Sequence, residues 1–123
     1  MLLSLLLFVL HVAISIAAKF NRRLKLMIKT RDNAYVIMTK GGKTGRRFIF
    51  KNGRYWSDKV LTDYDMALVF ENADIGFKTL AFGGDTGVQE AINNWKLKIR
   101  GDNHHVIWFS TVMGMALRQS ARK

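Results

Sequence analysis

The chain has 123 residues, and its 20 lysine and arginine residues against 9 aspartate and glutamate residues give a formal net charge of +11. It contains no cysteine, which excludes disulfides, thiolate metal sites and cysteine nucleophiles. The length beyond the apolar beginning is enough for one compact domain and too short for two.

The first 18 residues are apolar and carry no charged side chain, and Lys19 begins a basic stretch directly after them. As a helix they would extend roughly 27 Å, close to the hydrocarbon thickness of about 30 Å. We therefore predict a transmembrane anchor at 1–18, a basic juxtamembrane helix or linker at 19–32, and a folded domain at 33–123. The basic residues that follow the apolar run predict a single-pass topology with the domain on the cytoplasmic side.

Two alternatives remain open for this segment. Ser15-Ile16-Ala17 offers a small-x-small cleavage site for a secretory signal peptide, although no basic residue precedes the apolar run. A buried core helix is the second alternative. Whether the segment is retained or cleaved is left undecided.

The net charge is concentrated next to the apolar segment. Thirteen lysine and arginine residues and two aspartates lie from Lys19 to Lys59, whereas the residues from Val60 onward are balanced. Such a cluster is attracted to anionic lipid headgroups, although an ordinary solvated basic face is the plainer alternative. The residues expected to contact the membrane surface are Lys19, Arg22, Arg23, Lys25, Lys43, Arg46 and Arg47.

The middle of the chain predicts a β-sheet. We expect the apolar helix to run on as an amphipathic extension over 20–28, followed by strands near 34–39, 47–50, 54–57 and 65–70. Asn52-Gly53 is the pair best suited to a two-residue hairpin turn. This order predicts an antiparallel meander.

Helices and one further strand follow. Asp74 can cap a helix that ends before Gly83-Gly84, and Asp85 or Thr86 can cap a second helix over 87–94. The strand 95–100 alternates apolar with basic residues, so Trp95, Leu97 and Ile99 should face the core. Asp102 or Asn103 can then cap a last helix from His104 to about Gln119.

This order of elements, with Gly83-Gly84 at the turn and Lys-Leu-Lys-Ile-x-Gly-Asp at 96–102, resembles the sterol carrier protein type two domain over about residues 33–119. The resemblance implies an α+β fold in which an antiparallel sheet of about five strands has helices on one face and encloses an apolar tunnel for lipids. Asn94-Trp95 departs from the family pattern, so Trp95 is expected to narrow or reshape the tunnel. The C-terminal Ala121-Arg122-Lys123 is not a peroxisomal signal.

On this resemblance the chain is a membrane-anchored domain that binds or presents a lipid. It is expected to have no catalytic residue, metal or cofactor. Any of the candidate tunnel residues could equally be plain core. The candidates are Phe70, Ile75, Phe77, Leu80, Phe82, Ile92, Trp95, Trp108, Phe109, Met113 and Met115.

Other chemistries find weaker support in the sequence. The run from Asp102 to His105 lacks a matching metal cluster elsewhere, and a Ser110–His105–Asp102 triad has no supporting motif. Nucleic-acid binding would use aromatic residues between the sheet cations, and it loses support if those aromatics lie under the helices. They are Tyr35, Phe48, Phe50, Tyr55 and Trp56. A filled interior would instead indicate a non-catalytic subunit or scaffold, with protein partners in a membrane complex.

Overall fold

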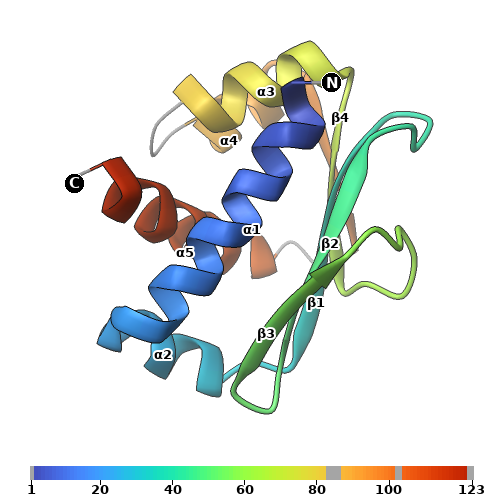
Figure 1. The fold of residues 1–123 in the computed structure, drawn as a ribbon. Helices are drawn as coiled ribbons and strands as arrows, with labels where there is room; N and C mark the ends of the chain where they lie inside the picture. The colour runs from blue at the N-terminus through green and yellow to red at the C-terminus, as the bar shows by residue number, and fades with distance from the viewer. Residues whose placement is uncertain (1, 83–86, 102–103, 122–123) are drawn as a thin grey trace.

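The computed structural model describes residues 2–82, 87–101 and 104–121. Figure 1 shows a sheet covered on one side by helices. The elements are α1 (Leu2–Phe20), α2 (Arg22–Lys29), β1 (Asn33–Thr39), β2 (Gly45–Lys51), β3 (Arg54–Asp58), β4 (Met66–Phe70), α3 (Ala73–Phe82), α4 (Gly87–Asn93), β5 (Leu97–Gly101) and α5 (His104–Ala121). The α+β class and the five strands expected from the sequence are confirmed.

The strand order is β3-β2-β1-β4-β5, and β1 pairs with β4 in parallel, with Tyr35 opposite Met66. The other three pairings are antiparallel. The predicted antiparallel meander is therefore wrong at one junction. The segment between β3 and β4 causes the difference, because its Leu61 and Tyr64 pack on the sheet face opposite the helices and carry the chain back beside β1.

One turn and one close approach of two strands explain two glycines that the sequence singled out. Asn52 and Gly53 have φ angles of 54° and 75°, so the predicted two-residue hairpin between β2 and β3 is confirmed. Gly101, at the end of the Lys-Leu-Lys-Ile-x-Gly motif, has a φ of 86°, and a Cβ there would overlap the carbonyl oxygen of Asp65. Only glycine fits this close approach of two strands without strain.

The expected continuous extension of the first helix is interrupted. Asn21 adopts an extended conformation with φ −93° and ψ 109°, and its Oδ1 accepts a hydrogen bond from the backbone N of Leu24 at 3.2 Å. Asn21 thereby caps a separate helix, α2, which turns away from the axis of α1 (Figure 1). Leu24 and Ile28 form the buried side of α2.

Helix α1 packs on the domain as one of its core elements. Its inner face, defined as Leu3, Leu7, Leu10, Ile14 and Ala17, belongs to the same buried cluster as the sheet and α5. The sequence analysis assigned 1–18 to a separate anchor. The 18-residue window Leu3–Phe20 is long and apolar enough to cross a membrane, a test that the core helix of a soluble protein also passes.

The helices near the C-terminal half follow the predictions with two corrections. The backbone N of Ile75 donates to Oδ1 of Asn72 at 2.9 Å, so Asn72 rather than Asp74 caps α3. Strand β5 begins at Leu97, because Trp95 lies in the turn after α4 with a φ of 62°. This turn leaves Trp95 81% exposed, and the expectation that it faces the core is wrong. The caps predicted at 85–86 and 102–103 lie outside the described residues.

Candidate functional site

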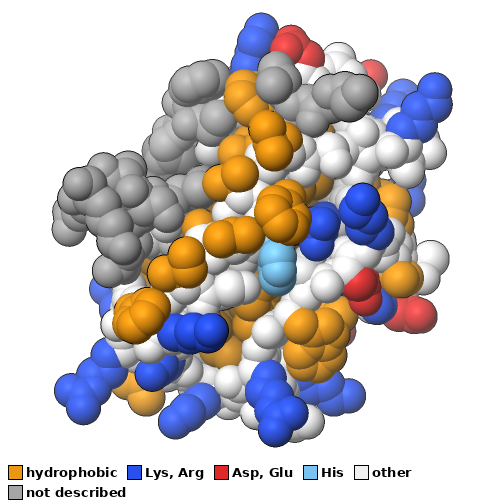
Figure 2. Space-filling model, viewed as in Figure 1, with side chains coloured by type: hydrophobic (Ala, Val, Ile, Leu, Met, Phe, Trp, Pro, Cys, Tyr) orange, Lys and Arg blue, Asp and Glu red, His pale blue; other side chains and the backbone are white. Residues whose placement is uncertain are grey.

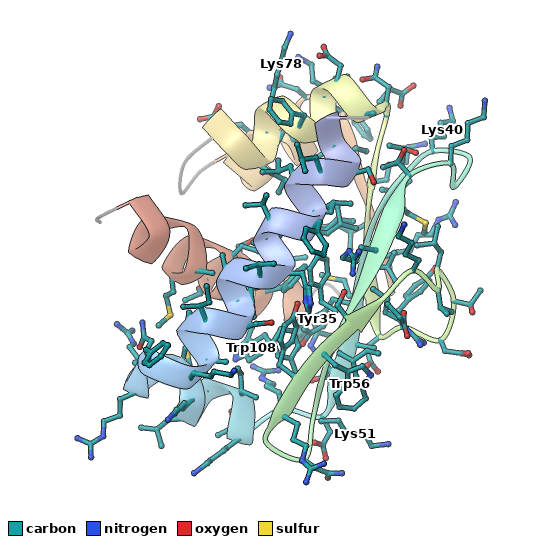
Figure 3. All side chains as sticks on the ribbon, viewed as in Figure 1. Tyr35, Lys40, Lys51, Trp56, Lys78 and Trp108 are labelled. Atoms are coloured by element: carbon teal, nitrogen blue, oxygen red, sulfur yellow. The ribbon has the colours of Figure 1, made fainter. Side chains whose placement is uncertain are left out.

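The space between the sheet and the covering helices holds an aromatic cluster. Tyr35, Phe48, Phe50 and Phe109 are fully buried. The ring centroids of Tyr35 and Phe109 are 4.9 Å apart, and those of Phe50 and Trp108 are 5.1 Å apart. Figure 3 shows Tyr35 and Trp108 between the sheet and the helices, with Trp56 directed away from them. Tyr55 packs against the same cluster, so four of the five aromatics considered for base stacking lie under the helices, which removes the support for nucleic-acid binding.

Most of the candidate tunnel residues are brought together in this interior. Nine of them belong to one buried cluster or pack directly against it: Phe70, Ile75, Phe77, Leu80, Ile92, Trp108, Phe109, Met113 and Met115. Trp95 lies apart from them on the surface. The side chain of Phe82 lies outside the described residues. The inner face of α1 lines the same interior, which the sequence analysis considered only as the alternative of a buried core helix.

Two tyrosine–histidine hydrogen bonds tie the covering helices to the sheet. The Tyr35 hydroxyl lies 2.9 Å from Nδ1 of His105 on α5, and the Tyr55 hydroxyl lies 2.8 Å from Nδ1 of His11 on α1. Burial raises the pKa of Tyr35 to about 12 and raises the pKa of Tyr55 as well. Both phenols therefore stay protonated at neutral pH and can donate these hydrogen bonds.

The hydrogen bond between Tyr35 and His105 also bears on the Ser110–His105–Asp102 triad that was considered from the sequence. His105 is engaged with a buried phenol, and Asp102 lies outside the described residues. Within the described ranges, no group of three His, Asp or Glu side chains is placed to hold a metal ion. His11 and His105 thus both serve as links between a covering helix and the sheet.

The side of α1 turned away from the core carries a row of exposed apolar side chains. We call this row the outer face of α1: Leu5, Phe8, Val9, Val12, Ile16 and Phe20. Spacings of three and four residues place its members along one side of the helix. Figure 2 shows hydrophobic side chains in a band along α1. An apolar row of this length is unusual on a monomeric surface and indicates an interaction site.

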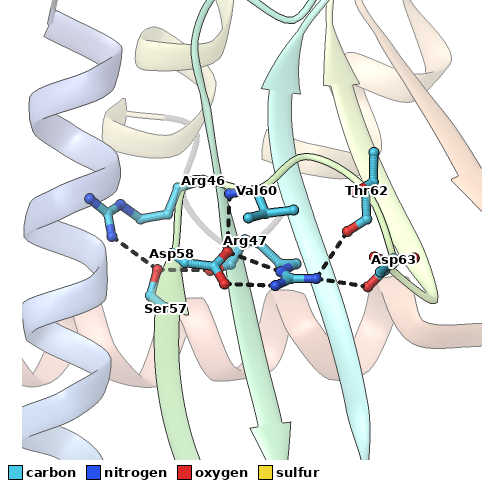
Figure 4. Close-up of polar contacts among 7 residues, drawn as sticks. All are labelled: Arg46, Arg47, Ser57, Asp58, Val60, Thr62 and Asp63. Carbon is cyan, nitrogen blue, oxygen red and sulfur yellow. Dashed lines mark hydrogen bonds and ion pairs between the residues drawn. The ribbon is translucent and has the colours of Figure 1, made fainter.

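Two neighbouring arginines of β2 lie on opposite faces of the sheet, because side chains alternate along a strand. Arg46 lies beside α1, with its Cζ 5.6 Å from the ring centre of Phe8 and its Nη1 donating to Ser57 Oγ at 3.1 Å. Arg47 donates from Nε and Nη2 to both carboxylate oxygens of Asp58, at 3.0 and 2.6 Å (Figure 4). This hydrogen-bonded arginine lowers the pKa of Asp58. Arg47, although predicted as a membrane-surface residue, is thus paired within the fold.

Two of the other predicted surface cations, Arg22 and Lys25, lie at one end of the molecule together with three cations that were not predicted as surface-contacting residues. We call it the cationic end: Arg22, Lys25 and Lys29 on α2, with Lys51 and Arg54 beside the β2–β3 turn. Lys29 approaches this turn closely enough that a Cβ on Gly53 would lie 3.5 Å from its Cγ. Lys43 belongs to the hairpin that begins near Lys40, at the other end of the sheet from Lys51 (Figure 3). The predicted cluster of surface cations is therefore divided between the two ends of the sheet.

A groove lies at the corner between α1 and α2. Its volume is about 310 Å³, and Phe20, Arg22, Lys25, Leu26 and Lys29 line it. The sequence analysis missed Phe20, Leu26 and Lys29 as site residues. The spacing of Arg22, Lys25, Leu26 and Lys29 at i, i+3, i+4 and i+7 was the available signal, since it places all four on one side of a helix.

No family model matches the chain, and no curated protein matches it. Solved structures do share its fold at low identity. One is described as the UbiJ-SCP2 ubiquinone synthesis protein, with a TM-score of 0.64 and 18% identity over 89% of this chain and 96% of that chain. Another is sterol carrier protein 2 from Yarrowia lipolytica in its apo form, with a TM-score of 0.64 and 18% identity over 88% of this chain and 86% of that chain. These likenesses establish the sterol-carrier-type α+β fold.

Proposed function

We propose that this chain is a non-catalytic lipid-binding domain that holds or presents a lipid at the cytoplasmic surface of a membrane. The observation that carries the proposal is the outer face of α1, an exposed apolar row with Arg46 beside it and the cationic end near its C-terminal end. A membrane surface supplies both an apolar layer and anionic headgroups. Solved structures of the same fold include a sterol carrier and a ubiquinone synthesis protein, which supports a hydrophobic lipid as the ligand.

In this arrangement α1 stays packed against the rest of the domain and holds the domain on the surface of the bilayer. Its inner face is buried in the domain core, so a transmembrane position would uncover Leu3, Leu7, Leu10 and Ile14 together with their partners in the sheet and α5. The outer face can instead enter the boundary between headgroups and acyl chains. Extraction of membranes with alkaline carbonate is expected to release the protein. Retention in the membrane would favour a spanning α1.

The bound lipid is proposed to occupy the apolar interior between the sheet and the helices. The candidate residues gathered there are apolar, and burial of a lipid surface against them is favourable by about 25 cal/mol per Å². Methionines such as Met113 and Met115 adapt to irregular ligand shapes. Such a site needs no reactive group, which is why we propose binding or presentation of a lipid without chemical change.

A second candidate is a non-catalytic subunit or scaffold of a membrane complex with a filled interior. The observation that favours it is the aromatic cluster, in which Tyr35, Phe50, Phe109 and Trp108 pack ring to ring between the sheet and α5. Rings packed at core density leave less room for a lipid. This candidate predicts protein partners and no stoichiometric lipid.

Native mass spectrometry of the protein purified in mild detergent tests the proposal, with lipid identification after denaturation. Met113→Trp on α5 enlarges a buried side chain, and Ile107→Trp enlarges an exposed side chain on the same helix. A stoichiometric lipid on the wild type and on Ile107→Trp, reduced on a folded Met113→Trp, supports an interior site. A lipid-free wild-type chain that retains other proteins would overturn the proposal in favour of the subunit.

A further inference from the structure

The corner between α1 and α2 brings cations and exposed apolar side chains into one groove. Asn21 ends the first helix, so Phe20 at the end of α1 faces the exposed side of α2. That side carries Arg22, Lys25 and Lys29 with Leu26 between them. The opposite side of α2 is anchored in the core by Leu24 and Ile28. The core contacts of Leu24 and Ile28 therefore hold in place the helix that carries most of the groove residues.

The three groove cations have no carboxylate partner in the part of the chain that the structure describes. The ion pairs found there join Lys40 to Glu71, Arg47 to Asp58 and Lys78 to Asp74. Asp32, the acidic residue closest in sequence, uses Oδ1 to accept a hydrogen bond from the backbone N of Asn52 at 2.9 Å. Three positive charges around one hollow favour an anionic ligand, and phosphate oxygens are strong acceptors for such donors.

The apolar part of the groove separates lipid phosphates from soluble ones. Phe20 is 80% exposed and Leu26 is 59% exposed, and both line the groove with the cations. A free phosphate would leave these side chains in water, whereas the glycerol backbone and the upper acyl chain of a phospholipid would cover them. Phe20 also belongs to the outer face of α1, so the groove continues the surface proposed to enter the bilayer.

We propose that this groove binds the headgroup of an anionic phospholipid, with Arg22, Lys25 and Lys29 on the phosphate and Phe20 and Leu26 against the glycerol and acyl carbons. The inference rests on the proposed membrane function and adds a discrete headgroup site to it. This site lies outside the interior proposed for the carried lipid. A membrane of anionic phospholipid would fix the domain in one orientation, with the α1–α2 corner in the headgroup layer.

The test is a calorimetric titration of the full chain with a short-chain phosphatidylglycerol below its micelle concentration, and with the matching phosphatidylcholine. The groove variant Lys25→Gln/Lys29→Gln removes two charges from the site. The control variant Lys96→Gln/Lys98→Gln removes two exposed charges at and just before β5, outside both the groove and the cationic end. Lys25→Arg/Lys29→Arg keeps the charges and tests rescue.

We expect saturable binding of one phosphatidylglycerol per chain, weaker binding of phosphatidylcholine, and at least a tenfold loss of affinity in the groove variant. The control variant should stay within about twofold of the wild type, and the arginine variant should restore binding. Equal losses in the groove and control variants, or no saturable binding, would overturn the headgroup site. Native mass spectrometry of the same variants separates this result from the proposed function: an interior lipid retained by a groove variant leaves that function standing.

Discussion

The inner and outer faces of α1 are built from the same residue types and have different partners. Leu7 on the inner face is 1% exposed, whereas Leu5, two residues earlier, is 60% exposed. The inner face closes the domain core with the sheet and α5. The outer face has no described protein partner that covers it. A predominantly apolar helix can thus have one face in the core and another exposed, which a hydropathy average does not reveal.

The largest expected difference compares Leu7→Ala with Leu5→Ala. Truncation of a buried leucine leaves a cavity, so Leu7→Ala should lower the free energy of unfolding by about 2–5 kcal/mol. Leu5→Ala should change it by less than about 0.5 kcal/mol, because the side chain is already in water. Urea denaturation without membranes measures both. Equal, small effects would show that α1 contributes little to the fold in water.

The inner face also depends on a glycine of α3. A Cβ on Gly76 would lie 3.0 Å from Cδ2 of Leu3 and 3.2 Å from the ring of Phe70. Gly76→Val should therefore cost about 2 kcal/mol of unfolding free energy through overpacking. In the double variant with Leu3→Ala, the valine gains room, so the combined loss should be smaller than the two single losses together. Strict additivity in denaturation experiments would mean that α1 does not press on α3.

The outer face can be tested by Val12→Ser against Val60→Ser. The two valines are similarly exposed, but Val60 lies in the β3–β4 connection beyond the sheet. If Val12 enters the bilayer, its loss should weaken binding to phosphatidylglycerol vesicles by about tenfold, since burial of a valine is worth about 1.5 kcal/mol. Val60→Ser should leave binding unchanged. Vesicle flotation measures both, and matching losses would contradict an oriented membrane contact.

The smallest expected effects separate Arg46 from Arg47. Arg46→Gln should weaken vesicle binding by about fivefold, because a cation near an anionic surface contributes about 1 kcal/mol. Arg47→Gln should leave vesicle binding unchanged and lower the free energy of unfolding by about 1 kcal/mol, since it breaks the two-pronged contact with Asp58. If Arg47→Gln weakened vesicle binding and Arg46→Gln did not, the face of the sheet opposite α1 would be the one that contacts the membrane.

The Arg47 effect should depend on pH. The contact with Arg47 lowers the pKa of Asp58 in the folded state, so its stabilisation is fully present above the ordinary carboxyl pKa of about 4. It is lost as the pH falls through the lower pKa of the folded state. The difference in stability between wild type and Arg47→Gln should therefore shrink below about pH 4. A difference that stays constant from pH 7 to pH 3 would exclude this cause.

Local patterns predicted the elements of the fold better than their arrangement. The Asn52-Gly53 turn and the apolar spacing of helices α4 and α5 are set by residue types that act within a few positions. The parallel pairing of β1 with β4 depends on how the β3–β4 connection crosses the sheet, and Leu61 and Tyr64 carry no short-range signal for that crossing. The outward position of Trp95 depends on a positive φ, which is uncommon for a large side chain.

The candidate site was predicted in part. The apolar residues expected around a lipid do gather in one interior, because alternation in strands and spacing in helices mark them as inward-facing. The role of α1 was harder to predict, because a span and a half-buried helix share the same composition. Ser4, His11 and Ser15 recur along one side of the helix, and His11 bonds to Tyr55 of the sheet. That polar row was the available sign that one side of α1 packs against the sheet.

Cysteine labelling of α1 tests most directly whether one face is core and the other contacts lipid. The chain has no native cysteine, so Val9→Cys and Leu10→Cys each introduce a single thiol, on the outer and inner face respectively. Without membranes, a water-soluble maleimide should label Val9→Cys quickly and Leu10→Cys slowly. Vesicles of phosphatidylglycerol should then protect Val9→Cys. Equal, rapid labelling at both positions in water would contradict the packing of α1 on the domain, and unchanged labelling of Val9→Cys on vesicles would contradict its contact with lipid.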